Sequence, residues 1–249
     1  MDGKRRRVAL ITGAGRGIGA ATAVLAARAG YDVCVNYASD RARAEAVAET
    51  CRNAGVRAVA VRADVADPDA VTALFAACDE ALGPVTLLVN NAGIIGRATT
   101  VAAVADDVLE RTFAVNVHGT IRCARAAIAR MAAAGGGVIV NLSSIAATTG
   151  SPGEYVHYAA SKAAVDAFTV GLAKEIGPLG IRVNAVQAGT TATEIHATAG
   201  NPDRPARVAK LAPLGRVAAP EEIAEAILWL ASDKAAYVTG AILRVGGGL

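Results

Sequence analysis

Short apolar runs alternate with amphipathic helical stretches along almost the whole chain, and this alternation constrains the fold more than any other feature. The apolar runs are brief and rich in Val, Ile and Leu, which is typical of strands covered on both faces. The predicted strands are Arg7–Thr12, Asp32–Tyr37, Ala58–Arg62, Leu87–Asn90, Gly137–Leu142, Arg182–Gln187 and Ala241–Val245. The predicted helices are Ile18–Ala29, Arg41–Ala54, Pro68–Leu82, Asp106–Ala134, Val156–Ile176 and Pro220–Ala231. The alternation predicts a doubly wound α/β fold, in which a parallel sheet carries helices on both faces.

The chain has no linker-like change in composition and no short repeat, so we expect residues 1–249 to form a single domain. One long irregular segment, at about residues 190–214, is rich in small polar residues and proline. Unstructured segments of that length usually serve as lids or binding loops. We therefore expect a substrate lid there.

The composition excludes several classes of protein. Apolar residues make up 53% of the 249 residues and charged residues 19%, so the chain can build a core and is not intrinsically disordered. The net charge of +3 does not indicate a nucleic-acid binder, and we interpret the basic run Lys4–Arg7 as a solvated strand entry. The longest uncharged stretch, Met131–Gly153, contains polar residues, glycine and proline, so it is no membrane span. We expect a cytoplasmic protein without nucleic-acid or membrane partners.

The cysteines and histidines do not suggest a metal site. The four cysteines are widely spaced and form no CxxC pair, which in a chain of this length indicates buried thiols in a reducing compartment. None of the three histidines has ligand spacing, so we expect no metal. A hydrolase is disfavoured because the chain contains no G-x-S-x-G motif.

A glycine-rich turn directly follows the first predicted strand and opens into a helix. Residues Thr12–Gly19 read TGAGRGIG, a T-G-x-x-x-G-x-G pattern. Glycines let the backbone turn sharply and approach a pyrophosphate, which then lies against the free amides of the helix start. A glycine cluster can also be an ordinary tight turn, but its position between a strand and a helix favours a dinucleotide site.

The second predicted strand ends without the acid that many NAD-binding folds place there for the ribose hydroxyls. The strand end carries Asn36, Tyr37 and Ser39, and both Asn36 and Ser39 are able to donate to a 2′-phosphate. Arg16 in the glycine turn would supply the counter-charge. Alternatively, Arg16 faces solvent and Asn36 merely ends a strand, and the nearby Asp40 keeps NAD(H) as a second option. We favour NADP(H).

Tyr158 and Lys162 lie four residues apart in a predicted helix, which places the phenol and the ammonium on one face. Because a nearby cation favours the phenolate, Lys162 together with the nicotinamide charge is predicted to lower the pKa of Tyr158. A tyrosine tuned in this way can exchange a proton with a carbonyl or an alcohol. Alone, the pair is more typical of an ordinary helix face, so its interpretation depends on its surroundings.

Three polar segments accompany this pair. Asn141–Ser144 and Asn90–Gly93 each end a predicted strand, where the loops of an open α/β sheet line the ligand crevice. A serine hydroxyl there can hydrogen-bond a developing oxyanion. Asn116 lies inside a predicted helix, where an asparagine competes with its own backbone and often marks a kink or a functional site.

Along essentially its whole length, the chain resembles the short-chain dehydrogenase/reductase family. The matching segments are Thr12–Gly19, Asp64-Val65, Asn90–Gly93, Asn116, Ser143/Ser144, Tyr158–Lys162 and Pro220–Gly248. The resemblance implies a Rossmann sheet of seven parallel strands that binds NAD(P)(H), and a catalytic tetrad of Asn116, Ser144, Tyr158 and Lys162. It implies that Tyr158 is the general acid/base and that Ser144 positions the carbonyl. It further implies that Lys162 holds the ribose, while Asn116 supports a water-linked proton relay.

The cofactor-binding set combines the glycine turn, the second strand end and positions implied by the resemblance. The set is Gly13, Gly15, Arg16, Gly17, Ile18, Gly19, Asn36, Tyr37, Ser39, Asp64, Val65, Asn90, Ala92, Gly93, Tyr158, Lys162, Gly189, Thr191 and Thr193. By the resemblance, Asp64 and Val65 flank the adenine, and Asn90, Ala92 and Gly93 line the ribose. Thr191 and Thr193 reach the nicotinamide end.

The chain departs from the family pattern at several places. Tyr158 follows Ser144 by fourteen positions, one more than in many members, so Ser143 is the fallback for the serine. Tyr155 has no lysine four residues later and is not the preferred base. Ala188 stands where the family usually has proline, which should leave that turn less rigid. Val245–Gly247 replaces a common Val-Asp-Gly, a change expected to affect assembly more than chemistry.

Two functional hypotheses follow. The first is an NADP(H)-dependent oxidoreductase acting on a small carbonyl or secondary alcohol, similar to 3-oxoacyl-acyl-carrier-protein reductases and sugar dehydrogenases. The second is a catalytically silent NADP(H)-binding sensor of the same fold, which would be expected to lack part of the tetrad. Because family members commonly form tetramers, we expect a homo-oligomer, a dimer or tetramer, joined through the helices predicted over Asp106–Ala134 and Val156–Ile176.

The substrate pocket is expected between Ile94–Arg97, Ile145–His157 and the predicted lid. Glu154 and His157 are candidates for binding hydroxyls. Arg204, Arg207 and Lys210 are candidates for meeting an anionic or acyl-carrier substrate. For each of these side chains, the favoured interpretation is an ordinary hydrated loop residue.

Overall fold

The sheet extends outward from β1 (Val8–Ile11), which pairs in parallel with β2 (Asp32–Tyr37) on one side and β4 (Leu87–Asn90) on the other. The computed structural model describes residues 7–249, so Lys4–Arg6 of the basic run lie outside the described residues. The remaining strands are β3 (Ala58–Arg62), β5 (Gly137–Ser144), β6 (Ile181–Ala188) and β7 (Ile242–Val245). Neighbouring strands are parallel in the order β3-β2-β1-β4-β5-β6-β7, which confirms the predicted seven-stranded Rossmann sheet.

Helices connect the strands close to the predicted bounds. They are α1 (Gly17–Arg28), α2 (Arg41–Asn53), α3 (Pro68–Leu82), α4 (Asp106–Phe113), α5 (Thr120–Ala133), α6 (Ala146–Thr149), α7 (Val156–Ile176), α8 (Ile195–Thr198), α9 (Arg204–Ala209) and α10 (Pro220–Ala231), with 3-10 turns η1 (Val101–Ala103), η3 (Gly177–Leu179) and η4 (Asp233–Ala235). Asp40 and Asp67 begin α2 and α3 because each carboxylate accepts a backbone N–H of the first turn.

The helix predicted over Asp106–Ala134 is divided in the structure. A π-helical turn, η2 (Ala114–Gly119), lies between α4 and α5 and contains Asn116. Gly119 in this turn lies against Val65, because a Cβ on Gly119 would come within 2.6 Å of Val65 Cγ2. Single π-helical turns inside helices are rare and are frequent at functional sites.

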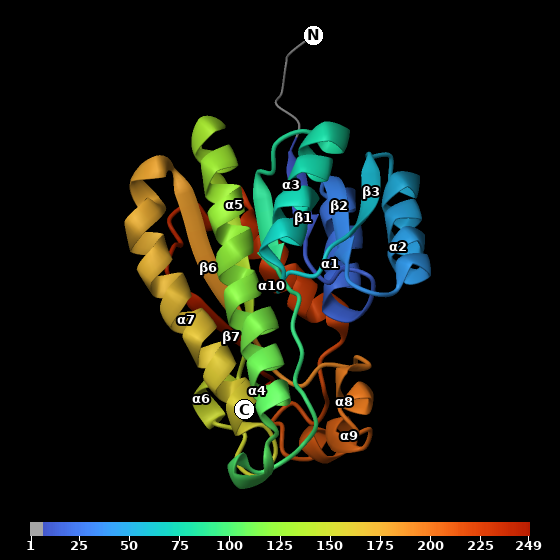
Figure 1. The fold of residues 1–249 in the computed structure, drawn as a ribbon, viewed down its shortest axis with the longest axis vertical. Coiled ribbons are helices and arrows are strands. Elements are labelled where there is room, and N and C mark those ends of the chain that lie inside the picture. Colours follow the sequence, from blue (N-terminus) through green and yellow to red (C-terminus); the bar gives the residue numbers. More distant parts are fainter. Residues whose placement is uncertain (1–6) are drawn as a thin grey trace.

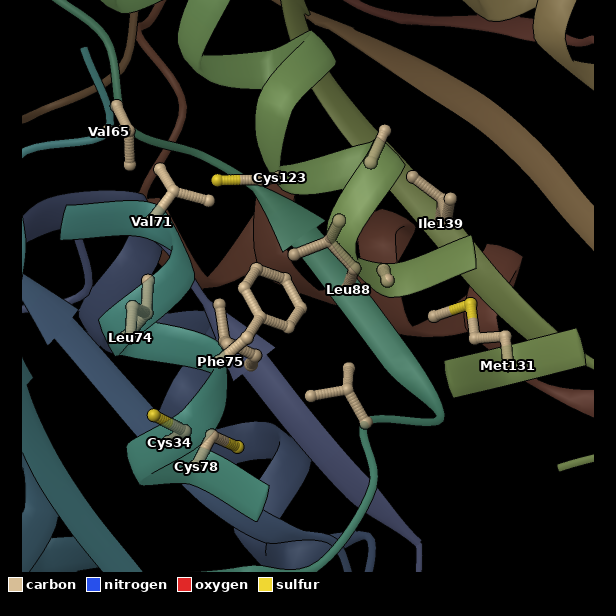
Figure 2. Close-up of a cluster of buried hydrophobic side chains, with 14 of the residues drawn as sticks. Cys34, Val65, Val71, Leu74, Phe75, Cys78, Leu88, Cys123, Met131 and Ile139 are labelled. Carbon is tan, nitrogen blue, oxygen red and sulfur yellow. The ribbon is translucent and has the colours of Figure 1, made fainter. Parts of the chain in front are cut away.

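Helices lie on both faces of the sheet (Figure 1), and each face has its own apolar cluster. On one face, α3, α5 and α7 pack over strand residues such as Leu10 and Leu88, and Figure 2 shows Phe75 of α3 beside Leu88. On the other face, α1, α2 and α10 cover the intervening strand residues, including Ile11 and Val89. Successive strand residues are therefore buried on opposite faces, which explains the nearly continuous apolar runs in the sequence.

The direction of the chain reverses between β1 and β4. From β1 the chain proceeds to β2 and β3, whereas from β4 it proceeds in the opposite direction to β7. Open α/β sheets bind ligands at such a switch point, beyond the carboxyl ends of the strands. A cleft of about 1740 Å³ opens there. Because single small ligands usually occupy pockets of roughly 300–1,000 Å³, this cleft has room for two molecules.

The segment 190–214 lines one side of this cleft and contains α8 and α9, which lie together beyond the sheet (Figure 1). A parallel bridge between Thr191 and Ala218 attaches the start of the segment to the chain before α10. The segment is thus more regular than predicted. Within residues 7–249, no helix is both long and apolar enough to cross a membrane.

Candidate active site

The glycine turn is built by close backbone approach. Gly13 and Gly17 have φ values of +63° and +55°, a region that favours glycine. A Cβ on Gly19 would lie 2.4 Å from Asn91 Nδ2 and 2.6 Å from the Gly13 carbonyl oxygen, so any larger residue would push the turn apart. Gly13, Gly15, Gly17 and Ile18 line the cleft, whereas Gly19 lies behind the turn and lets it close.

The start of α1 remains open toward the cleft. Arg16 occupies the N-cap position with extended backbone, but its side chain makes no capping hydrogen bond, and the first turn carries no acid. The free N–H groups of a helix start attract anions. The glycine turn and this uncapped helix therefore fit the pyrophosphate of a dinucleotide.

The structure revises the role predicted for Asn36. Its side chain is buried, with Oδ1 accepting from the Gly13 N–H at 3.2 Å and Nδ2 donating to the carbonyls of Ala63 (3.0 Å) and Val61 (3.3 Å). These bonds use the amide to join the glycine turn to β3. Asn36 therefore supports the turn from behind and does not point an amide at a 2′-phosphate.

An arginine that the sequence analysis did not name lies in the cleft near the second strand end. Arg43, from the first turn of α2, lines the cleft beside Arg16, Tyr37 and Ser39. Both arginines converge on Glu194 from the segment 190–214, at 2.7 Å for Arg43 Nη1 and 3.4 Å for Arg16 Nη1. Sequence reasoning missed Arg43, although its position three residues after the capping Asp40 offered a signal.

Asn90 also points away from the cleft. Its Nδ2 donates to Asn141 Oδ1 at 2.9 Å, inside the protein, so the prediction that Asn90 lines the ribose is revised. Asn91 takes that place: it lines the cleft with Ala92 and Gly93, and its Nδ2 donates to the Thr12 and Gly13 carbonyls.

Asp64 and Val65 line the same end of the cleft as the second strand end. Burial alone would raise the pKa of Asp64, but the Ala66 N–H and the Arg111 guanidinium together lower it. Arg111 Nη2 lies 2.6 Å from Asp64 Oδ2. Asp64 is therefore a carboxylate that is already held by the protein.

The structure brings Ser144, Tyr158 and Lys162 together in the cleft. Ser144 ends β5 and lies close enough to Tyr158, in the first turn of α7, to act on its pKa. Lys162 Nζ lies 5.8 Å from the centre of the Tyr158 ring and donates to the Leu142 carbonyl at 2.7 Å. Ser143, the fallback serine, donates instead to the Lys162 carbonyl at 3.3 Å and is buried.

In the protein without cofactor, the pKa of Tyr158 is shifted in the direction opposite to the predicted one. Burial raises the pKa of Tyr158, against the opposing effects of the Ser144 hydrogen bond and the Arg204 charge. Burial also lowers the pKa of Lys162 to about 8. The protein's own groups therefore do not bring the pKa of Tyr158 toward neutrality. The predicted lowering of this pKa includes the effect of the nicotinamide charge, which comes only with bound cofactor.

Asn116 does not line the cleft but holds its wall in place. Its Oδ1 accepts from the Ile94 N–H at 2.9 Å, and its Nδ2 donates to the Ile94 carbonyl (2.9 Å) and to Ser161 Oγ (3.0 Å). The π-helical turn presents this fully buried amide to the loop after β4. All its hydrogen bonds therefore join η2 to that loop and to α7.

Two of the departures from the family pattern, at Ala188-Gly189 and at Val245–Gly247, lie next to each other in the structure. A Cβ on Gly189 would lie 2.8 Å from Gly246 Cα, and Gly189 N–H donates to the Val245 carbonyl at 2.8 Å. Gly246 thus packs directly behind the cleft wall, nearer the site than predicted. Gly189, Thr191 and Thr193 all line the cleft.

The far end of the cleft holds charged side chains from the predicted substrate region. Glu154 pairs with Arg204 and Arg207, and all three line the cleft. His157 does not line it. It is a buried residue of α7 whose ring Nε2 hydrogen-bonds the Ile95 carbonyl at 3.1 Å, so it is not the hydrated loop side chain that the sequence favoured. His196 lines the cleft and was missed, because a lone histidine in an irregular segment gives no sequence signal.

The doubly wound sheet, the glycine turn and the group of Ser144, Tyr158 and Lys162 in one cleft define a nicotinamide-dependent oxidoreductase. Residues 13–249 match a family model described as Enoyl-(Acyl carrier protein) reductase. The chain belongs to the short-chain dehydrogenase/reductase family.

Full-length relatives agree with this assignment. The chain is 46% identical over 244 residues to the uncharacterized oxidoreductase YgfF of Escherichia coli (strain K12), which covers 97% of this chain and 99% of that protein. It is 42% identical to the L-rhamnose 1-dehydrogenase (NAD(P)(+)) of Sphingomonas sp. (strain SKA58), over 100% of this chain and 97% of that protein. The crystal structure of a short-chain type dehydrogenase/reductase from Mycobacterium marinum superposes with a TM-score of 0.91 at 34% identity, covering 97% and 94% of the two chains. The protein is therefore an oxidoreductase of CH–OH and C=O groups that uses NAD(H) or NADP(H).

Proposed function

We propose that the protein is an NADP(H)-dependent oxidoreductase that transfers a hydride between nicotinamide and a carbonyl or secondary alcohol, with Tyr158 as the general acid/base. The observation that carries the proposal is the placement of Tyr158 between Ser144 and Lys162 in the cleft that the glycine turn enters. The glycine turn and the start of α1 would hold the pyrophosphate. When bound, the nicotinamide supplies the hydride donor or acceptor.

Each side chain of the predicted tetrad has its own role in the proposed reaction. Tyr158 gives its proton to the carbonyl oxygen in reduction and takes the proton back from the alcohol in oxidation. Ser144 hydrogen-bonds the same oxygen and fixes it beside the phenol. Lys162 lies beside the Tyr158 ring, and its ammonium stabilises the phenolate that remains after Tyr158 gives up its proton. Asn116 is a positioning residue, because its amide is occupied by Ile94 and Ser161.

The preference for NADP(H) rests on Arg16 and Arg43. Their guanidiniums converge on one carboxylate, Glu194, so this corner of the cleft is already arranged to hold an anion. A 2′-phosphate is the anion that NADP(H) would present beside Ser39. Asp40 is engaged as the cap of α2 and in an ion pair with Arg43, which makes it less available to ribose hydroxyls.

The test of the reaction is Tyr158→Phe. We expect kcat to fall about 10³-fold or more with a neutral ketone, because the proton transfer is lost, while the Kd for NADPH stays nearly unchanged. Tyr155→Phe is the matched control on the same turn and should retain turnover. Substantial activity in Tyr158→Phe would place the base elsewhere.

The test of cofactor choice is Arg43→Gln. We expect the Kd for NADP⁺ to rise about tenfold and the Kd for NAD⁺ to stay constant, because only the 2′-phosphate needs the guanidinium. Arg41→Gln, an exposed arginine in the same turn that does not line the cleft, is the control. Equal effects on the two cofactors would remove Arg43 from the argument.

A catalytically silent sensor would be expected to lose part of the tetrad, and the complete set speaks against that alternative. We further propose a cytoplasmic homo-oligomer, a dimer or tetramer, assembled through α4–α5 and α7. The many alanines of these helices would allow close approach of two copies.

A further inference from the structure

The end of the cleft that α9 lines contains charges that the proposed proton transfer does not use. Glu154 lies in the turn before α7. Its carboxylate accepts hydrogen bonds from Arg204 Nε at 2.9 Å and from Arg207 Nη2 at 2.7 Å, and both arginines belong to α9. Burial alone would raise the pKa of Glu154, but the two arginines lower it. Glu154 is therefore a carboxylate whose oxygens are occupied by the protein itself.

Arg204 is held from three sides. Its guanidinium lies 5.5 Å from the centre of the Tyr155 ring, and its Nη1 donates to Thr190 Oγ1 at 3.2 Å in addition to the Glu154 pair. Its side chain is 16% exposed, whereas that of Arg207 is 59% exposed. Among residues 7–249, none accepts a hydrogen bond from Arg204 Nη2. A guanidinium ordered in advance loses little freedom on binding a ligand.

The charges at this end of the cleft do not balance. Two arginines share the single carboxylate of Glu154, and within residues 7–249 no other acid forms an ion pair with either. The excess positive charge reaches the reacting group: burial raises the pKa of Tyr158, and Arg204 opposes that rise. A partly buried excess of positive charge favours an anionic ligand.

A second polar group at this end lacks a partner. His196 in α8 is 6% exposed and lines the cleft, and its Nδ1 is buried without a hydrogen-bond partner in the described part of the chain. Burial and then the Arg204 charge lower the pKa of His196 to about 4, so the ring is neutral near pH 7. Because its Nδ1 is closed off from the open cleft, His196 forms a neutral part of the wall and leaves the binding of an anion to Arg204.

We propose that the substrate carries a carboxylate, which Arg204 binds at this end of the cleft while its alcohol or carbonyl group meets Tyr158. The substrate class is then the hydroxy acids and the corresponding oxo acids. The proposal rests on the proposed oxidoreductase function of the same site. Glu154 keeps its place and orients Arg204 toward the ligand. Arginine suits this role because its planar guanidinium matches a carboxylate.

The test measures binding as well as turnover. Cyclohexanecarboxylate and pentanoate are titrated calorimetrically against the matched amides, cyclohexanecarboxamide and pentanamide, using the protein alone and the protein saturated with NADP⁺. We expect at least one acid to bind ten times more tightly than its amide. Arg204→Gln should abolish that preference, and Arg204→Lys, which keeps the charge, should restore part of it. Lys210→Gln changes an exposed cation of the same segment that does not line the cleft, and should change nothing.

Several results would overturn the proposal: equal binding of acid and amide, binding of neither, or a preference that survives in a folded Arg204→Gln protein. Reduction of neutral cyclohexanone separates the two claims. Tyr158-dependent reduction of cyclohexanone without any acid preference would reject the carboxylate and leave the oxidoreductase proposal standing. Circular dichroism and Tm of each variant establish that the fold is retained.

Discussion

Asn36 and Asn90 each lie at the end of a strand beside the cleft, and each turns its amide into the protein. The backbone carbonyls of Val61 and Ala63 accept from the first amide, and Asn141 Oδ1 accepts from the second. Buried amides must be hydrogen-bonded, and these partners lie within reach before any ligand arrives. As a result, Arg43 and Asn91 take the positions at the cleft wall.

His196 provides a residue-scale prediction for stability. Its pKa is about 4 in the folded protein against an ordinary value of 6.5. Between these values the unfolded chain binds more protons, so the free energy of unfolding should fall as pH drops below 6.5. From pH 7.5 to pH 5.0 this contribution is about 2 kcal/mol. Urea unfolding at both pH values should show that His196→Gln loses that much less stability than the unchanged protein.

His118→Gln, at an exposed position of η2, controls for the loss of a histidine as such. An identical acid-dependent loss in His196→Gln and the unchanged protein would contradict the assignment to His196.

At the scale of elements, the segment 190–214 joins both ends of the cleft. Its start lies over the glycine turn, since a Cβ on Gly17 would come within 3.1 Å of Thr193 Cγ2. Glu194 follows and pairs with Arg16 and Arg43, and Arg204 lies farther along at the substrate end. One short stretch of chain therefore touches the pyrophosphate turn, the candidate 2′-phosphate corner and the candidate carboxylate site.

Glu194→Gln tests this coupling between elements. The carboxylate of Glu194 competes with a 2′-phosphate for Arg16 and Arg43, so its removal should tighten NADP⁺ binding severalfold and leave the Kd of NAD⁺ unchanged. Fluorescence titration with both cofactors measures the effect. Glu45→Gln is the matched control, because Glu45 pairs with Arg52 elsewhere on α2. Weaker NADP⁺ binding in Glu194→Gln would show that Glu194 helps the cofactor instead.

At the scale of the whole molecule, the two apolar clusters enclose all four cysteines. Cys34, Cys78 and Cys123 lie in the cluster under α3, α5 and α7, and Cys51 lies in the other. All four are free thiols with no exposed surface. Burial raises the pKa of Cys51 to about 11 and that of Cys123 to about 12, so almost no thiolate is present at neutral pH.

The folded protein should therefore resist thiol reagents. We expect no thiol to react with Ellman's reagent at pH 8 within minutes, and four per chain to react once guanidinium unfolds the protein. A rapidly reacting thiol in the folded state would mean that one of these clusters opens. Matched samples with and without dithiothreitol should have the same Tm.

The sequence by itself determined the sheet, the glycine turn and the spacing of Tyr158 and Lys162, because these depend on local periodicity and on short motifs. It placed α3, α7 and α10 at the bounds that the structure shows. It could not determine where a side chain points or what neutralises it. The division of the long helix at η2 likewise depends on contacts with distant chain, including the approach of Gly119 to Val65.

Only the tertiary structure decided which polar groups reach the cleft. Arg43, His196 and Arg204 come from separate elements, and no sequence spacing connects them. Arg43 acts on Glu194 at one part of the cleft, whereas Arg204, which is largely buried, acts on Glu154 and His196 at another. Burial around Arg204 weakens solvent screening and strengthens those effects. Short local motifs thus identify the residues proposed to carry out the reaction. The groups proposed to select cofactor and substrate come together only in the tertiary fold.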